Sequence, residues 1–150
     1  MINYSAPDLT KFPPRSPRVR LGGYVILPRL LDKCRALLAG KNAEYNYNCP
    51  LDKRFLGFTG IDPEALKAEV GLGKGDGEIL AWIQERVIPK RTDVEVAAWS
   101  SQESSRVSGD AESRGYFQEI HQAIAPSRAD IYTWFDLLDL DDYVSYGGKA

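Results

Sequence analysis

The sequence is poor in the residues that most often carry catalytic or metal chemistry. Its 150 residues include two cysteines and one histidine. Cys34 and Cys49 form neither a CxxC motif nor a zinc-ligand spacing, and two cysteines are too few for a disulfide framework. We therefore expect no metal site, no cofactor, and a cytoplasmic protein whose thiols are reduced.

Long apolar runs and a surplus of positive charge are missing as well. No segment approaches the roughly 18 consecutive apolar residues of a membrane span, and the N-terminus lacks the apolar region of a signal peptide. The formal net charge is -2, which argues against a protein that binds nucleic acid mainly through phosphate contacts. The expected partner is an unknown small molecule or protein, and neither a membrane nor a nucleic acid.

Two familiar binding loops are absent. The stretch Gly71–Glu78 reads GLGKGDGE, but it does not match the GxxxxGK[ST] pattern, and no strand is predicted before it. We interpret it as a connector between helices. The acidic residues near the C-terminus lack the loop glycine and closing glutamate of a calcium-binding EF-hand, so we interpret them as a solvated face.

The composition that remains is typical of a globular domain. Hydrophobic residues make up 43% of the chain and charged residues 27%, and the length suits one domain covering residues 1–150. The predicted fold class is mainly α, with five or six helices in a compact domain. Residues 1–23, rich in proline, are predicted to form an extended arm packed on the body.

The clearest helix is predicted between Tyr24 and Ala39. Its apolar residues recur at steps of three and four and form one stripe. Pro28 suits the first turn, so the regular helix should begin near residue 26 or 27, and Gly40 is the expected left-handed stop. The charged residues of this segment lie off the stripe: Arg29, Asp32, Lys33 and Arg35.

The later helices are predicted from their start signals. Asp62 precedes a proline and a glutamate, Thr92 begins a capping box, and Thr133 has the same spacing to an aspartate. Asp110 can cap a further helix. The expected helices cover about residues 62–70, 77–86, 92–99, 110–125 and one or two short segments within 131–150, and the serine-rich residues 100–110 are predicted to be a mobile loop.

The stretch Glu44–Phe55, EYNYNCPLDKRF, is both polar and aromatic. Tyrosine and asparagine alternate with a period of two, which predicts a small β-hairpin over residues 45–58. Such a patch can recognise a ligand, because pockets combine aromatic area with a few polar groups. The alternative is that its amides and carboxylates satisfy their own turn backbone. The predicted ligand-binding residues are Tyr45, Asn46, Tyr47, Asn48 and Asp52, with Arg15, Arg18 and Trp134 beside them.

Cys49 is the candidate nucleophile. Basic residues follow it at 53 and 54, and positive neighbours favour a reactive thiolate. The base would be His121, the only imidazole, or Asp52. The alternative is that Cys49 fills a gap in a turn and that His121 is a half-buried packing residue. Cys34 lies on the apolar stripe and is predicted to be core.

Three arginines of the arm form a third candidate site. Arg15, Arg18 and Arg20 lie in an extended frame that can contact anions or an RNA backbone. The interpretation that we favour is that they pair with the acidic C-terminal stretch and close the arm onto the body. The acidic residues of that stretch are Asp136, Asp139, Asp141 and Asp142.

Three blocks of the sequence resemble an uncharacterised bacterial family, the domain of unknown function DUF5069. They read DLTKFPPRSPRVRLGGYVILPRLLDKCRALLAGKN, EYNYNCPLDKRFLGFTGID and TWFDLLDLDDYVSYGGK, and the resemblance extends over residues 8–149. It implies a stand-alone, soluble, mostly helical domain with no assigned activity and no catalytic residues to transfer.

The leading hypothesis is a non-catalytic binding or interaction module that uses the patch at residues 45–52. The alternative is a small cytoplasmic enzyme that uses Cys49 with His121 or Asp52. A third hypothesis is RNA or anion binding through the arm arginines. A homodimer is also expected, because two-fold dimers are the commonest assembly of such domains.

Overall fold

The computed structural model describes all of residues 1–150 and contains seven helices and no β-strand. The mainly α class is therefore confirmed, whereas the predicted number of helices is too low. None of the helices combines the length and the apolar composition needed to cross a membrane. The helices are α1 (Leu27–Leu38), α2 (Pro50–Thr59), α3 (Pro63–Val70), α4 (Asp76–Arg86), α5 (Asp93–Ser104), α6 (Ala111–Ile124) and α7 (Trp134–Ser145).

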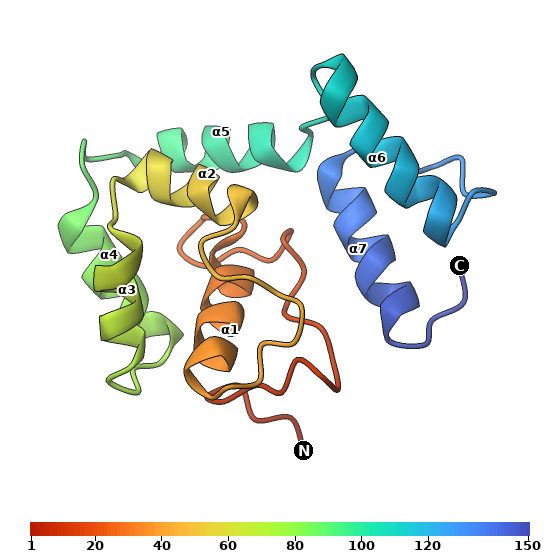
Figure 1. The fold of residues 1–150 in the computed structure, drawn as a ribbon. Coiled ribbons are helices and arrows are strands. Elements are labelled where there is room, and N and C mark those ends of the chain that lie inside the picture. The colour runs from red at the N-terminus through yellow and green to blue at the C-terminus, as the bar shows by residue number, and fades with distance from the viewer.

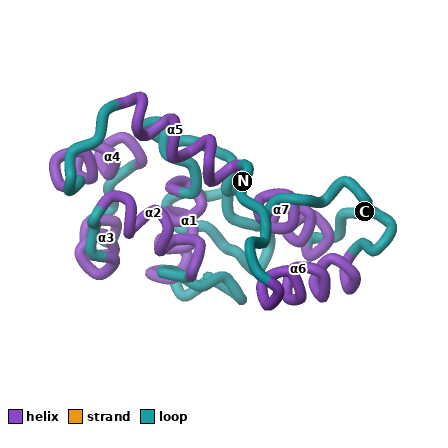
Figure 2. Tube along the Cα trace, turned by 90° about the horizontal axis from the view of Figure 1, so that it is seen from above, coloured by secondary structure: helices purple, strands orange, loops and turns teal.

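The helices form two groups. Helices α1 to α5 make up a body, and α6 and α7 lie together on one side of it in both views (Figure 1, Figure 2). The N-terminal residues have no regular helix and run past α1 toward α7. The hydroxyl of Tyr146 donates to the Leu9 carbonyl, and the Leu9 N–H donates to the Lys41 carbonyl at 2.9 Å. The arm therefore connects the body to the end of α7.

Each group has its own hydrophobic core. The main core contains 18 buried residues, all but one from residues 24–96, and the second core contains five buried residues of α6, α7 and the segment between them. The exception is Phe135 of α7, which is fully buried in the main core. Phe135 is thus the apolar anchor of the α6–α7 pair on the body.

Helix α1 lies inside the body and has the predicted boundaries. Pro28 occupies its first turn, and Gly40 follows its end with φ of 68°. Ten of its twelve residues are buried. Ile26, the residue before the helix, has φ of 74°, an unusual conformation for a β-branched side chain. Its N–H donates to the Pro17 carbonyl at 2.9 Å, which links the arm to the start of α1.

The predicted β-hairpin at residues 45–58 is wrong, because α2 occupies most of this stretch. Pro50 is the first residue of α2, and Asp52 in the first turn accepts the Asn48 N–H at 2.9 Å. This start signal resembles the one at residues 62–64, but the alternation of tyrosine and asparagine before it favoured a strand. The helix ends at Gly60, which has φ of 71°.

The helix starts predicted from capping signals are confirmed. Asp62, Thr92, Asp110 and Thr133 each accept a backbone N–H from three residues further on. The predicted loop at residues 100–110 is partly wrong, because α5 continues to Ser104. The buried Glu103 stabilises the continuation, because it pairs with Arg54 of α2 and with Arg106 just beyond the helix.

Replacing Phe135 with alanine should destabilise the protein by about 3–5 kcal/mol, because a fully buried aromatic ring is lost from the main core. Tyr143 of the same helix is exposed, so Tyr143→Ala should change stability by no more than about 0.5 kcal/mol. Denaturant unfolding measures both values. Equal effects of the two substitutions would contradict the anchoring role of Phe135.

Candidate functional site

The charged residues of α1 are buried together with the apolar residues of its first ten positions. Arg29, Asp32, Lys33 and Arg35 are 8% exposed or less, although they lie off the apolar stripe. Buried charges need partners, and each of these has one from a different element. The pairs are Arg29–Asp142 in α7 at 2.7 Å, Asp32–Arg15 in the arm at 3.0 Å, Lys33–Asp52 in α2 at 2.9 Å and Arg35–Asp76 in α4 at 2.8 Å.

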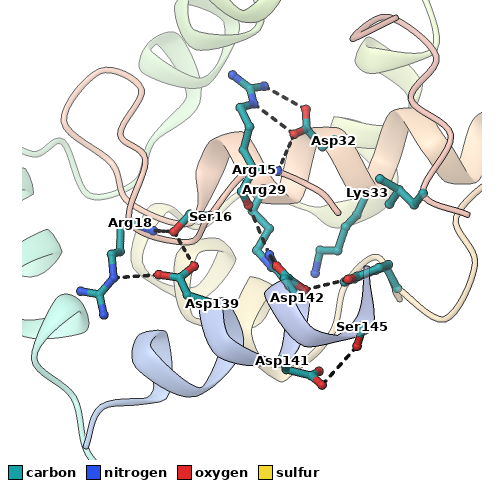
Figure 3. A network of polar contacts seen from close by, with 12 residues as sticks. Arg15, Ser16, Arg18, Arg29, Asp32, Lys33, Asp139, Asp141, Asp142 and Ser145 are labelled. Carbon is teal, nitrogen blue, oxygen red and sulfur yellow. Dashed lines mark hydrogen bonds and ion pairs between the residues drawn. The ribbon is translucent and has the colours of Figure 1, made fainter. Parts of the chain in front are cut away.

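The arm arginines take part in this network. Arg15 donates to both carboxylate oxygens of Asp32 and also reaches Asp76 at 2.7 Å. Burial opposes ionisation of Asp76, but hydrogen bonds from Arg15 and Arg35 outweigh it and lower the pKa of this carboxyl. Arg18 pairs with Asp136 and, at 2.9 Å, with Asp139 of α7. The expected pairing with the C-terminal acids thus holds for Arg18, whereas Arg15 binds the body (Figure 3).

A cavity of about 660 Å³ lies beside α1, between the body and the α6–α7 pair. The arm, α1, residues 43–51, α6 and α7 all contribute to its walls. Three tyrosines line it: Tyr45, Tyr116 and Tyr146. The inner polar groups come from Arg29, Lys33 and Cys49. Its volume falls within the range of small-molecule sites, which is about 300–1,000 Å³.

Lys33 connects Cys49 to two other groups. Its ammonium donates to the sulfur of Cys49 at 3.1 Å and to the carbonyl of Asn46 at 3.1 Å. Asp52 Oδ1 lies 2.9 Å from the same nitrogen but makes no aligned hydrogen bond. The lysine side chain is 4% exposed and that of Asp52 is 0% exposed, so this ion pair is fixed in the interior.

Arg29 is held in a similar way on the α7 side. It donates to both oxygens of Asp142 and to the Arg15 carbonyl, and Tyr45 donates its hydroxyl to Asp142 at 2.7 Å. Burial and the contact with Asp142 raise the pKa of Tyr45. Three of the five N–H donors of Arg29 are used in this way, so two have no acceptor in the protein.

The charges around the cavity do not cancel. Asp142 neutralises Arg29, and Asp52 neutralises Lys33. Glu44 and Asp141 also line the cavity, and neither forms an ion pair. Burial and the neighbouring charge of Asp142 raise the pKa of Asp141. In Figure 3 Asp142 points toward Arg29, whereas Asp141 points toward Ser145, its only hydrogen-bond partner at 3.4 Å.

The predicted recognition patch is divided between the cavity and the interior. Tyr45 and Asn46 line the cavity with Cys49. Tyr47 donates its hydroxyl to the Pro63 carbonyl at 2.7 Å and packs against the main core. Asn48 has φ of 60° at the turn before α2, and Asp52 is fully buried behind it.

The other predicted site residues lie elsewhere. The ring of Trp134 packs against Phe117 in the α6–α7 pair, with 5.2 Å between centroids. His121 bonds through Nε2 to the Arg128 carbonyl at 2.6 Å, and no hydrogen bond joins it to Cys49. Arg15 lines a separate cavity of about 360 Å³ beside Arg35 and Lys74. No group of three or more histidine, cysteine or acidic side chains is arranged to hold a metal ion.

The residues that organise this site cannot be recognised from the sequence alone. Lys33 and Arg29 lie off the apolar stripe of α1, which is where solvated charges usually lie. The sequence contains one local signal. Four charged residues occupy the seven positions 29–35 of this helix, and the segments before and after the helix carry residues of the opposite charges. Asp141 was predicted only as part of an acidic face, and its lack of a partner depends on the three-dimensional packing.

Comparison with known proteins gives a family but no activity. The chain matches the family described as Domain of unknown function (DUF5069) over residues 11–144. A search of curated proteins found none that matches the chain.

Two adjacent aspartates should respond to substitution in opposite ways. Asp142→Asn should destabilise the protein by about 3–5 kcal/mol, because Arg29 is then buried without a counter-charge. Asp141→Asn should stabilise it at neutral pH by less than about 1 kcal/mol, because a half-buried carboxylate without a cation partner is removed.

The pH dependence of unfolding tests whether the charge of Asp141 is the reason for the stabilisation expected from Asp141→Asn. The raised pKa means that the folded state binds a proton at Asp141 more tightly than the unfolded state does. This carboxyl therefore lowers stability as pH rises from below its ordinary pKa through its raised pKa. The advantage of Asp141→Asn should disappear at acid pH, where Asp141 is protonated. An advantage that is independent of pH would contradict this cause.

Proposed function

The chain belongs to the DUF5069 family, and we propose that it is a non-catalytic binding module whose cavity holds a small organic amine. The ligand would carry its positive charge near Asp141 and Glu44 and a hydrogen-bond acceptor near Arg29. The observation that supports this most directly is that these two acids are the carboxylates of the cavity without a cation partner.

Asp141 supports the proposal because its negative charge destabilises the folded state. Burial raises the pKa of its carboxyl, so the ionised form is less favourable in the folded state than in the unfolded chain. Residues that reduce stability in this way are found preferentially at functional sites. A bound ammonium group would supply the missing counter-charge.

The aromatic walls suit the same class of ligand. Tyr45, Tyr116 and Tyr146 line the cavity, and the faces of aromatic rings attract organic cations. The guanidinium of Arg29 lies 5.5 Å from the ring centroid of Tyr45, and this contact supports a ring that can attract a cation. The two N–H donors that Arg29 has left would bind a carbonyl or carboxylate at the other end of the ligand.

Isothermal titration calorimetry with butylamine, butyrate, butanol and an aminobutyrate tests this proposal, because the four ligands differ in charge and not in chain length. The amines should bind more tightly than butyrate and butanol, and the aminobutyrate should bind most tightly. Affinity for butylamine should rise with pH as Asp141 ionises. Tighter binding of butyrate than of butylamine would contradict the proposal.

Asp141→Asn should weaken butylamine binding roughly tenfold, which corresponds to about 1.4 kcal/mol. Asp93→Asn is the matched control, because it removes one exposed carboxylate of α5 that does not line the cavity. The control should bind butylamine as the unsubstituted protein does. Equal losses in both variants would assign the effect to net charge and not to the site.

Two further expectations belong to this proposal, and two other predictions from the sequence are separate from it. The protein is proposed to act in the cytoplasm, which two free cysteines support. Residues 1–150 are proposed to fold as one domain, since Phe135 and the arm join the two cores. The homodimer stays a prediction, which analytical sedimentation tests. RNA binding by the arm arginines also stays a prediction, and the salt dependence of RNA affinity tests it.

A further inference from the structure

We propose that Cys49 is a covalent attachment point in the cavity, where its thiolate exchanges with a small amine-bearing disulfide and retains one half as a mixed disulfide. The preference for an amine rests on the proposed function. The reactivity of the thiol does not, because it depends on the cluster formed by Cys49, Lys33 and Asp52. The two parts can therefore be tested separately.

Cys49 is placed to meet a molecule in the cavity. It lines the cavity wall, is partly exposed, and directly precedes α2. The other thiol, Cys34, is fully buried in the main core, and burial raises the pKa of Cys34 to about 12. A reagent that reaches the folded protein should therefore modify a single cysteine.

Lys33 gives Cys49 a partner that an ordinary surface thiol lacks. The ammonium is fixed by Asp52 and by the Asn46 carbonyl, and its bond to the sulfur is 3.1 Å long. This contact with a charged donor fixes the sulfur at the cavity wall, where it can attack a disulfide that enters the cavity.

The exchange balances without a further reagent. The Cys49 thiolate attacks one sulfur of the disulfide, a new S–S bond forms, and the original S–S bond breaks. The electron pair of the broken bond leaves with the second half as a thiolate, which takes a proton from water. A second exchange with a free thiol releases the attached group, so the modification is reversible.

The charge of the disulfide should affect the rate at which it reacts with Cys49 in the cavity. Asp141 and Glu44 carry the uncompensated charge of the cavity, so a cationic disulfide is concentrated there and an anionic one is repelled. Lys33 and Arg29 do not reverse this order, because Asp52 and Asp142 neutralise them. Cystamine is the cationic probe, hydroxyethyl disulfide the neutral one and dithiodiglycolate the anionic one.

The experiment measures the rate of mixed-disulfide formation by intact mass for the three probes under native conditions. All three should modify one site. The rate of each probe is divided by its rate with free cysteine, because the pKa of the leaving thiol also affects exchange, and this normalised rate should be about tenfold higher for cystamine than for dithiodiglycolate. Cys49→Ser should abolish the modification, and Asp141→Asn should reduce the ratio between the two probes. Failure of all three probes to modify the folded protein would overturn the attachment proposal.

The remaining outcomes separate the two proposals. Equal normalised rates at Cys49, or the highest normalised rate with dithiodiglycolate, would overturn the amine preference and the proposed function with it, while the thiol would stay reactive. The role of Lys33 is tested in a double variant, Lys33→Gln with Asp52→Asn, which removes both charges of this ion pair, so that neither is left buried without its partner. Its folding is checked by circular dichroism. In the folded variant all three probes should react about tenfold more slowly, and unchanged rates would overturn the contribution of Lys33.

Discussion

The structure depends on the burial of charge along α1. Four charged side chains of this helix lie in the interior, and each is neutralised by a partner from a different part of the chain. A buried ion pair adds little net stability over an apolar pair, but a buried charge that loses its partner costs about 3–5 kcal/mol. The arm, α2, α4 and α7 are therefore fixed in position by the need to neutralise α1.

This constraint also creates the cavity. Asp142 on α7 must reach Arg29, and Asp52 on α2 must reach Lys33, which holds both helices beside the same face of α1. The α6–α7 pair has a separate hydrophobic core, and it meets the body through the buried ring of Phe135 and through ion pairs of α7 with Arg18 and Arg29. Ligand sites are common between packed helices. Asp141, the residue before Asp142 on α7, lines this cavity.

Local signals in the sequence predicted most of the helices. Caps at Asp62, Thr92, Asp110 and Thr133 depend on residues three positions apart, and the stripe of α1 depends on its own periodicity. The failure at residues 45–58 arose because alternation of tyrosine with asparagine resembles a strand, whereas Pro50 and Asp52 begin a helix. The helix-start signal at Pro50 and Asp52 therefore outweighed the strand-like alternation of the residues before it.

The site was less predictable because its pairs are distant in the sequence. Cys49 and Tyr45 were recognised from local composition, but Lys33 and Asp142 acquire their roles from partners 19 and 113 positions away. A charged residue beside an apolar stripe is usually solvated. Its burial can be predicted only if the residue of opposite charge that contacts it in the fold is known. The partners of the arm arginines were equally hard to predict. Arg18 pairs with a C-terminal aspartate as predicted, whereas Arg15 pairs with Asp32 of α1.

A double-mutant cycle at Lys33 and Asp52 tests the central claim most directly. If α1 requires its charges to be neutralised, Lys33→Met and Asp52→Leu should each destabilise the protein by about 3–5 kcal/mol, and the double variant should lose less than either one. Denaturant unfolding gives all three values. Losses that simply add in the double variant would mean that the two charges act independently and that neutralisation of α1 does not hold the fold together.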